Sequence, residues 1–109
     1  QLLVAPRQAN ALAIVINELI TNSIKHAFFE GVGSIKTEIS LDKDDERLVT
    51  LIFKDDGPGW PEEVLRGERS GVGVHLMQLL ARGPLLDSLI FYNDGGAIAR
   101  LKFRLVPLS

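Results

Sequence analysis

The sequence predicts a single α+β domain, a two-layer α/β sandwich with helices on one face of a mixed, mostly antiparallel sheet. Three observations predict it. An apolar pattern of helical period fills the first quarter of the chain, two strand-like segments follow, and a helix with two further strands then repeats this order. The length of 109 residues suits one domain with one core. Because the chain does not begin with methionine, we expect residues 1–109 to be one domain of a larger protein.

The first helix is expected over about residues 6–28, where apolar side chains gather on one side. At about 100° per residue, Glu18, Asn22 and Lys25 fall within an arc of roughly 60° on the polar side. A carboxylate, an amide and an ammonium group in one line suit a hydrated divalent cation and phosphate oxygens. An ordinary solvent-exposed helix face explains this stretch equally well when it is taken alone.

Two strands are expected next, over residues 34–41 and 48–54, joined by a charged, solvated connection at residues 42–47. The second strand ends at Asp55, and two glycines and two prolines follow within residues 57–61. These residues predict an irregular loop whose backbone a ligand can approach closely. An acid at such a strand end can accept a hydrogen bond from a ligand, although a plain turn has similar residues.

The second half is expected to form a short charged connector, a helix and a hairpin of two strands, at residues 62–69, 71–82, 89–93 and 98–106. The helix follows a Gly-X-Gly sequence, Gly71 to Gly73. Such a start leaves backbone N–H groups free to face an anion, which the helix dipole also favours. Packing or turn geometry is the equally good alternative for this pattern alone.

Composition excludes several classes of partner. The formal net charge of −2 provides neither a basic field for nucleic acid nor a polybasic run for an anionic membrane, so we expect neither partner. The absence of cysteine excludes disulfides and thiolate zinc sites. The longest apolar run, residues 11–16, is far shorter than the roughly 20 residues of a membrane span. A reducing cytosol fits the absence of cysteine without following from it. We expect a cytoplasmic domain, whose parent protein could still be anchored in a membrane.

Three of these segments, in this order, resemble motifs of the ATP-binding domain shared by sensor histidine kinases, gyrase, Hsp90 and MutL. Residues 17–27 (NELITNSIKHA) resemble its N-box, residues 55–59 (DDGPG) its G1 box, and residues 71–74 (GVGV) its G2 box. The similarity spans about residues 9–105. One box alone is unspecific, but three in order are strong evidence, and the resemblance implies a Bergerat-type ATP-binding fold.

The resemblance assigns a role to each matching N-box residue. Asn22 would coordinate an Mg²⁺ ion that bridges the triphosphate of ATP, and Lys25 would contact phosphate. Glu18 would polarise the attacking group or order water near the metal. His26 would either line the phosphate end of the site or, as the more common role for such a residue, pack at a polar edge.

The other two boxes would hold the base and the phosphates. The resemblance implies that Asp55 accepts a hydrogen bond from the adenine amino group, which selects ATP over GTP. Gly57 and Gly59 would let the base lie close to the chain. The third box would present backbone N–H groups to the phosphates at the start of the last helix, from Gly71, Val72 and Gly73.

Among family members, the chain resembles most closely the sensor histidine kinases with a short ATP lid, because only residues 60–69 separate the second box from Ser70. This implies a catalytic domain that passes the γ-phosphoryl group of Mg-ATP to a histidine on a separate dimerisation domain, with a response regulator downstream. An anti-sigma factor serine kinase of the same superfamily is the first alternative. Neither His26 nor His75 is expected to be the phosphoacceptor, and Trp60 is expected to pack at the base of the lid.

The chain departs from the family pattern at three positions. Ala97 stands where the family often has the threonine of a Gly-Gly-Thr sequence, so a hydroxyl expected near the adenine is missing. Val72 replaces the usual leucine of the second Gly-X-Gly, and residues 84–88 lack an expected glycine. These departures motivate a second alternative, a degenerate domain that serves as a docking module.

Overall fold

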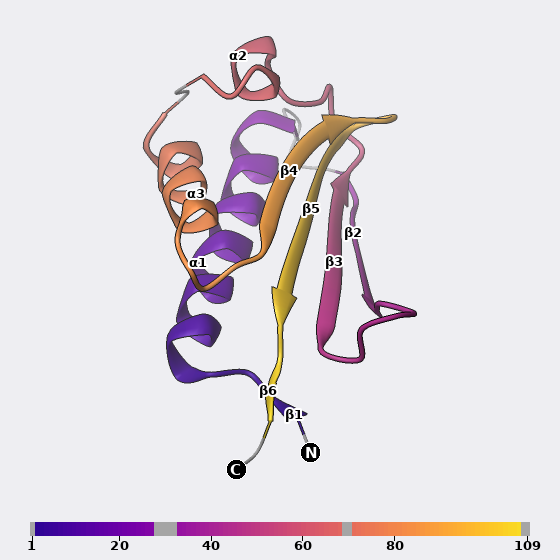
Figure 1. The fold of residues 1–109 in the computed structure, drawn as a ribbon. Helices are drawn as coiled ribbons and strands as arrows, with labels where there is room; N and C mark the ends of the chain where they lie inside the picture. The colour runs from indigo at the N-terminus through magenta and orange to yellow at the C-terminus, as the bar shows by residue number, and fades with distance from the viewer. Residues whose placement is uncertain (1, 28–32, 69–70, 108–109) are drawn as a thin grey trace.

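The computed structural model describes residues 2–27, 33–68 and 71–107, which form a helical layer over one face of a sheet (Figure 1). The sheet has four strands in the order β2-β3-β5-β4. Their bounds are Ile35–Leu41 for β2, Leu48–Asp55 for β3, Ser88–Asn93 for β4 and Ala97–Arg104 for β5. Every pairing among these described strands is antiparallel. The predicted α+β sandwich is confirmed, and no parallel pair occurs in the described part of its sheet.

Two helices, α1 (Pro6–Asn22) and α3 (Val72–Arg82), lie on the same side of the sheet (Figure 1). A short helix, α2 (Glu62–Leu65), lies in the predicted charged connector. The predicted elements are thus found close to the residues that the apolar patterns indicated.

The core lies between the sheet and the helical layer. On β3, Val49, Leu51 and Phe53 are buried because alternate residues of a strand point to the same face. The antiparallel register places Ala99 and Leu101 of β5 beside Phe53 and Leu51 on that face. The helices complete the core with the buried side chains of Val15, Leu19, Val74 and Met77.

Helix α1 begins at Pro6, a residue that suits the first turn because its nitrogen carries no hydrogen and its φ is fixed. After Asn22 the helix continues as a π-helical turn, Ser23–Ala27. The predicted end of this helix near Phe28 lies outside the described residues. π-helical turns are rare and occur frequently at functional sites.

A small two-stranded sheet, which the sequence did not predict, joins the two ends of the described chain. Strand β1 (Leu2–Leu3) pairs with β6 (Val106–Pro107) in antiparallel register (Figure 1). The predicted last strand therefore divides: β5 ends at Arg104 and β6 begins at Val106. Between them, the backbone N–H of Leu105 still donates to the Arg47 oxygen at 2.8 Å, in the register that pairs β5 with β3.

The predicted charged connection between β2 and β3 is a hydrogen-bonded turn. The Oδ1 atom of Asp42 accepts the backbone N–H groups of Asp44 and Asp45 at 2.8 and 3.2 Å. Asp45 in turn pairs with Arg104, and this hydrogen bond from Arg104 holds the pKa of the Asp45 carboxyl below its ordinary value. Among the described residues, no group of three acids or histidines is placed to hold a metal ion, and no helix is long and apolar enough to cross a membrane.

Gln8 ties the start of α1 to the rest of the fold. Its buried side-chain Nε2 donates to the backbone oxygens of Leu85, at 3.3 Å, and Arg104, at 2.6 Å. These contacts join α1 to the connection before β4 and to the end of β5.

We predict that Gln8→Ala lowers the free energy of unfolding by about 1–3 kcal/mol, because two carbonyl groups lose a donor. Urea unfolding followed by circular dichroism measures the effect. Asn10→Ala, at an exposed amide of the same helix, is the control and should stay within about 0.5 kcal/mol. Equal effects of the two substitutions would contradict the role assigned to Gln8.

Candidate functional site

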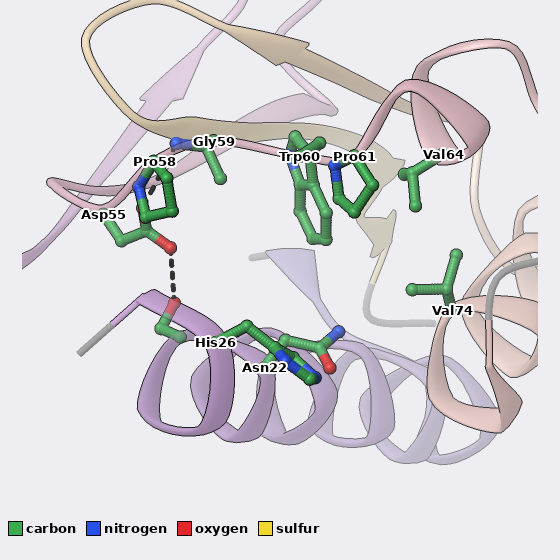
Figure 2. A pocket seen from close by; sticks show the side chains of 11 residues that line it. Asn22, His26, Asp55, Pro58, Gly59, Trp60, Pro61, Val64 and Val74 are labelled. Carbon is green, nitrogen blue, oxygen red and sulfur yellow. Dashed lines mark hydrogen bonds between the residues drawn. The ribbon is translucent and has the colours of Figure 1, made fainter. Parts of the chain in front are cut away.

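A pocket of about 320 Å³ opens between the C-terminal end of α1, the loop after β3, and the helices α2 and α3 (Figure 2). The residues that line it are Asn22, Ser23, His26, Asp55, Pro58, Gly59, Trp60, Pro61, Val64, Val74 and Ala97. Prolines, valines and tryptophan form the apolar walls, and the polar groups come mainly from α1 and the end of β3. Clefts of this size and composition are typical of small-molecule sites.

The carboxyl group of Asp55, 5% exposed at the end of β3, lies in this pocket. Its Oδ1 atom accepts the backbone N–H groups of Gly57, at 3.0 Å, and Ala97, at 3.1 Å. Its Oδ2 atom accepts the hydroxyl of Ser23 at 2.8 Å, the bond drawn from Asp55 to the helix in Figure 2. Three segments of the chain therefore fix the orientation of this carboxyl group.

The neighbouring acid, Asp56, points elsewhere. Its carboxyl group accepts the backbone N–H and the hydroxyl of Ser34, both at 3.0 Å, at the start of β2. These two hydrogen bonds lower the pKa of Asp56 below its ordinary value. The exposed Asp56 thus fastens the loop, whereas Asp55 faces the pocket.

Asn22 lines the pocket from α1, and its Nδ2 atom is buried without a hydrogen-bond partner among the described residues. Leaving a buried polar group unpaired costs about 1–3 kcal/mol. Such orphaned groups are uncommon in folded proteins, so the amide is suited to a polar ligand that enters the pocket.

The remaining N-box residues lie at different places. His26 is exposed and lines the pocket in Figure 2, so it is not packed in the interior. Lys25 is exposed and is not among the residues that line the pocket. Glu18 lies against the start of α3: a Cβ atom added to Gly73 would come within 2.1 Å of its Oε2 atom. The structure therefore brings Glu18 beside the third box.

The glycines of the two loops have distinct roles in the backbone. Gly59 has φ +97°, and an added Cβ would come within 2.8 Å of the Asn93 side chain. Gly71 is the N-cap residue of α3 with φ +83°, and Val72 is the first residue of that helix. Gly57 donates its N–H to Asp55. The lining of the pocket includes residues of all three sequence boxes, with Val74 from the third.

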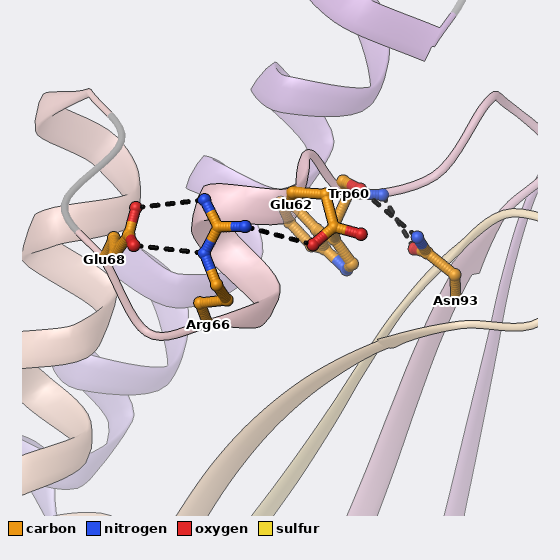
Figure 3. Close-up of polar contacts among 5 residues, drawn as sticks. All are labelled: Trp60, Glu62, Arg66, Glu68 and Asn93. Carbon is orange, nitrogen blue, oxygen red and sulfur yellow. Dashed lines mark hydrogen bonds and ion pairs between the residues drawn. The ribbon is translucent and has the colours of Figure 1, made fainter.

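Trp60 packs at the start of the connector that leads from the second box to α2, as predicted. Its indole Nε1 donates to the backbone oxygen of Ile98 at 2.9 Å, and its ring centroid lies 4.7 Å from that of Phe91. Asn93 holds its backbone: Oδ1 accepts the Trp60 N–H at 2.7 Å and Nδ2 donates to the Trp60 oxygen at 3.2 Å (Figure 3). These contacts hold the indole ring in the pocket wall.

Beyond α2, Arg66 forms ion pairs with Glu62 at 3.3 Å and Glu68 at 3.0 Å (Figure 3). All three side chains are more than half exposed, so these pairs contribute little stability. The three residues lie in the charged connector, whose short length predicted a short ATP lid.

Comparison with known proteins agrees with this fold. The family model described as "Histidine kinase-, DNA gyrase B-, and HSP90-like ATPase" matches residues 7–106, and the chain belongs to this family. It is thus an ATP-binding domain of the kind found in sensor histidine kinases.

The chain is similar to the sensor histidine kinase PdtaS of two mycobacteria. It is 33% identical to the Mycobacterium tuberculosis protein over 86 residues, which cover 75% of this chain and 16% of that protein. It is 31% identical to the Mycolicibacterium smegmatis protein over 108 residues, 94% of this chain and 20% of that one. The chain therefore spans a fifth or less of these relatives.

Two solved structures share the fold. The histidine kinase domain of the EL346 blue-light activated histidine kinase from Erythrobacter litoralis matches with a TM-score of 0.73 at 22% identity, over 89% of this chain and 44% of that chain. The mycobacterial sensor histidine kinase MprB matches with a TM-score of 0.72 at 14% identity, over 97% of this chain and 78% of that chain.

We predict opposite effects for alanine at two glycines of the site. Gly96 is buried with φ +150°, and an added Cβ would lie 1.9 Å from the backbone oxygen of Asp55, so Gly96→Ala should destabilise the fold by about 2–4 kcal/mol. At Gly73 the obstacle is the end of the Glu18 side chain, which can rotate away, and alanine favours a helix by up to about 1 kcal/mol. Gly73→Ala should therefore retain or raise the urea midpoint. A large loss of stability in Gly73→Ala would show that Glu18 is held rigidly.

Proposed function

We propose that this chain is the catalytic domain of a two-component sensor histidine kinase, which binds Mg-ATP and positions its γ-phosphoryl group for transfer to a histidine on a separate dimerisation domain. The observation that carries the proposal is the buried carboxyl group of Asp55 in an apolar pocket. Asn22 lines the same pocket, and its Nδ2 atom has no hydrogen-bond partner among the described residues. The family of the chain supports the nucleotide, and its named relatives support the kinase class.

The apolar half of the pocket suits the base. Trp60, Pro61 and Val64 provide flat or compact apolar surfaces along the wall of the pocket, and Pro58 lies beside Asp55 (Figure 2). A buried acceptor favours a base that carries an amino group, since a keto oxygen at the same place would leave both groups without a donor. Adenine is the base of ATP that meets this requirement.

The polar end of the pocket suits the phosphates. Asn22 and His26 both line the pocket here. Lys25, in the same π-helical turn as His26, is exposed. The backbone N–H groups at the start of α3, from Gly71, Val72 and Gly73, suit phosphate oxygens.

The residues present also fit an Mg²⁺ ion held together with the nucleotide. The Oδ1 atom of Asn22, which lines the pocket, is an amide oxygen of the kind that binds Mg²⁺, and the Nδ2 atom, which has no partner among the described residues, is a donor suited to a phosphate oxygen. When bound, the ion would neutralise charge on the phosphate oxygens.

The proposed transfer needs little covalent chemistry from the chain. A ring nitrogen of the acceptor histidine attacks the γ-phosphorus atom, the bond to the bridging oxygen breaks, and ADP leaves. Glu18 polarises the attacking imidazole, and its place beside the start of α3 keeps it close to the third box. Positioning and charge neutralisation account for most of the catalysis in such reactions.

We predict that the 109-residue chain binds a slowly hydrolysed ATP analogue in calorimetric titration, and that Asp55→Asn weakens this binding at least tenfold. The matched control is Asp56→Asn, which changes the adjacent acid outside the pocket and should leave the affinity within about threefold. Circular dichroism verifies that both variants are folded.

The metal has its own test. Removal of Mg²⁺ should weaken binding by the unchanged chain, and Asn22→Ala should abolish this dependence. If the unchanged chain binds no analogue at millimolar concentration, the kinase proposal is wrong and the docking module is favoured.

We predict that Glu18→Gln leaves analogue binding within about twofold but slows phosphorylation of the acceptor histidine by roughly 10²–10⁴-fold. The assay supplies the dimerisation domain of the parent protein and measures acid-labile phosphohistidine. Glu38→Gln, at an exposed acid on β2, is the control. Without the dimerisation domain, neither His26 nor His75 should become labelled, and labelling of either would contradict the assignment of a separate acceptor.

A further inference from the structure

Strand β2 exposes apolar side chains on the face of the sheet that is buried in the next strand. It is the last strand of the sheet, on the side away from α3 (Figure 1). Ile39 lies beside Leu51, which is 6% exposed, yet Ile39 itself is 71% exposed. Leu41 lies beside Val49, which is 5% exposed, and is itself 58% exposed. The helical layer therefore leaves β2 uncovered.

The outer edge of β2 also carries a row of backbone groups. The N–H of Asp42 donates to the Leu48 oxygen at 2.9 Å. The oxygen of Ser34 accepts the N–H of Asp56 at 3.3 Å. Backbone groups of an antiparallel strand alternate in direction, so the even-numbered residues of β2 face β3 and the odd-numbered residues within 35–41 face outward. No other described strand pairs with this edge, and such an edge is a template for a further strand.

The charges on the opposite face of β2 are incompletely paired. Lys36 lies directly opposite Lys54 of β3, and like charges in this arrangement destabilise a sheet. Glu38 lies two residues along the same face of β2. Within the described residues, none of these three side chains forms an ion pair. A carboxylate on the free side of Lys36 would compensate the two ammonium groups.

We infer that β2 is a self-association surface, on which a second copy of this chain pairs its own β2 in antiparallel register about Thr37. The two sheets then join into one. Odd-numbered residues face odd-numbered residues, as the outward backbone groups require. Each Lys36 lies opposite Glu38 of the other copy, at a position without backbone hydrogen bonds, where side chains approach most closely. On the other face, Ile35 lies opposite Ile39.

The competing register is centred on Ile39, because it also pairs odd-numbered residues with each other. It would pair Lys36 with Asp42, whose Oδ1 atom already accepts two backbone N–H groups of the following turn. It would also leave Glu38 opposite an uncharged side chain, that of Ser40. Charge complementarity therefore favours the register about Thr37.

Charge reversal tests this register by sedimentation equilibrium at up to about 1 mM protein. Lys36→Glu sets two carboxylates opposite each other in each pair, and Glu38→Lys sets two ammonium groups there. Each variant alone should weaken self-association roughly tenfold or more. An equimolar mixture of the two variants restores opposite charges at both positions, so it should associate about as strongly as the unchanged chain. Lys102→Glu, the same change on the same face but on β5, is the control and should stay within about twofold.

Circular dichroism verifies that the variants are folded, and Lys36→Glu should not destabilise the single copy because it removes the like pair with Lys54. The inference is wrong if the unchanged chain stays monomeric at about 1 mM, if Glu38→Lys associates as before, or if the mixture fails to associate.

The inferred surface is independent of the proposed function. Neither Lys36 nor Glu38 lines the pocket, so both variants should bind the ATP analogue with the affinity of the unchanged chain. Glu38→Gln remains a control for phosphoryl transfer, since so weak a pairing is not populated at micromolar protein.

Discussion

The hydrogen bonding of the Asp55 carboxyl group is the constraint on which the rest of the site depends. A buried carboxyl group is costly unless its oxygens find donors. Here the donors come from the loop after β3, from the start of β5 and from the end of α1. All three must converge at one point, and the close approach of Gly96 to the Asp55 backbone makes this convergence tight. The contacts that satisfy the acid therefore also shape the pocket.

Helix α1 couples stability to the site because one element serves both. Its buried residues Val15 and Leu19 pack into the core, while Asn22 and Ser23, one turn later, face the pocket. The change to π-helical geometry occurs where the core side of the helix ends and the pocket side begins. Since core packing fixes the axis of the helix, the positions of the pocket residues are fixed with it.

The sequence predicted most of the fold because the apolar periods of α1, β3 and β5 are long enough to read. It did not predict the pair of β1 and β6, since two-residue strands have no period and form only when the chain ends meet. The three boxes singled out Asp55 and Asn22, and both line the pocket, while their roles toward the nucleotide and the metal stay predictions. Ser23, whose hydroxyl donates to Asp55, was missed because a serine in a helical segment gives no local signal of a distant partner.

The order of residues along α1 suggests how a single helix can serve several parts of the proposed reaction. Ser23 is bonded to the acid that faces the base, Asn22 lies in the same pocket, and Glu18 lies about 6 Å further back along the axis, at a rise of about 1.5 Å per residue. Glu18 there meets the start of α3, and the N-terminal end of a helix favours negative charge. In the proposed function, the residues assigned to the base, the metal and the acceptor therefore lie in order along one helix, whose packing in the core fixes their spacing.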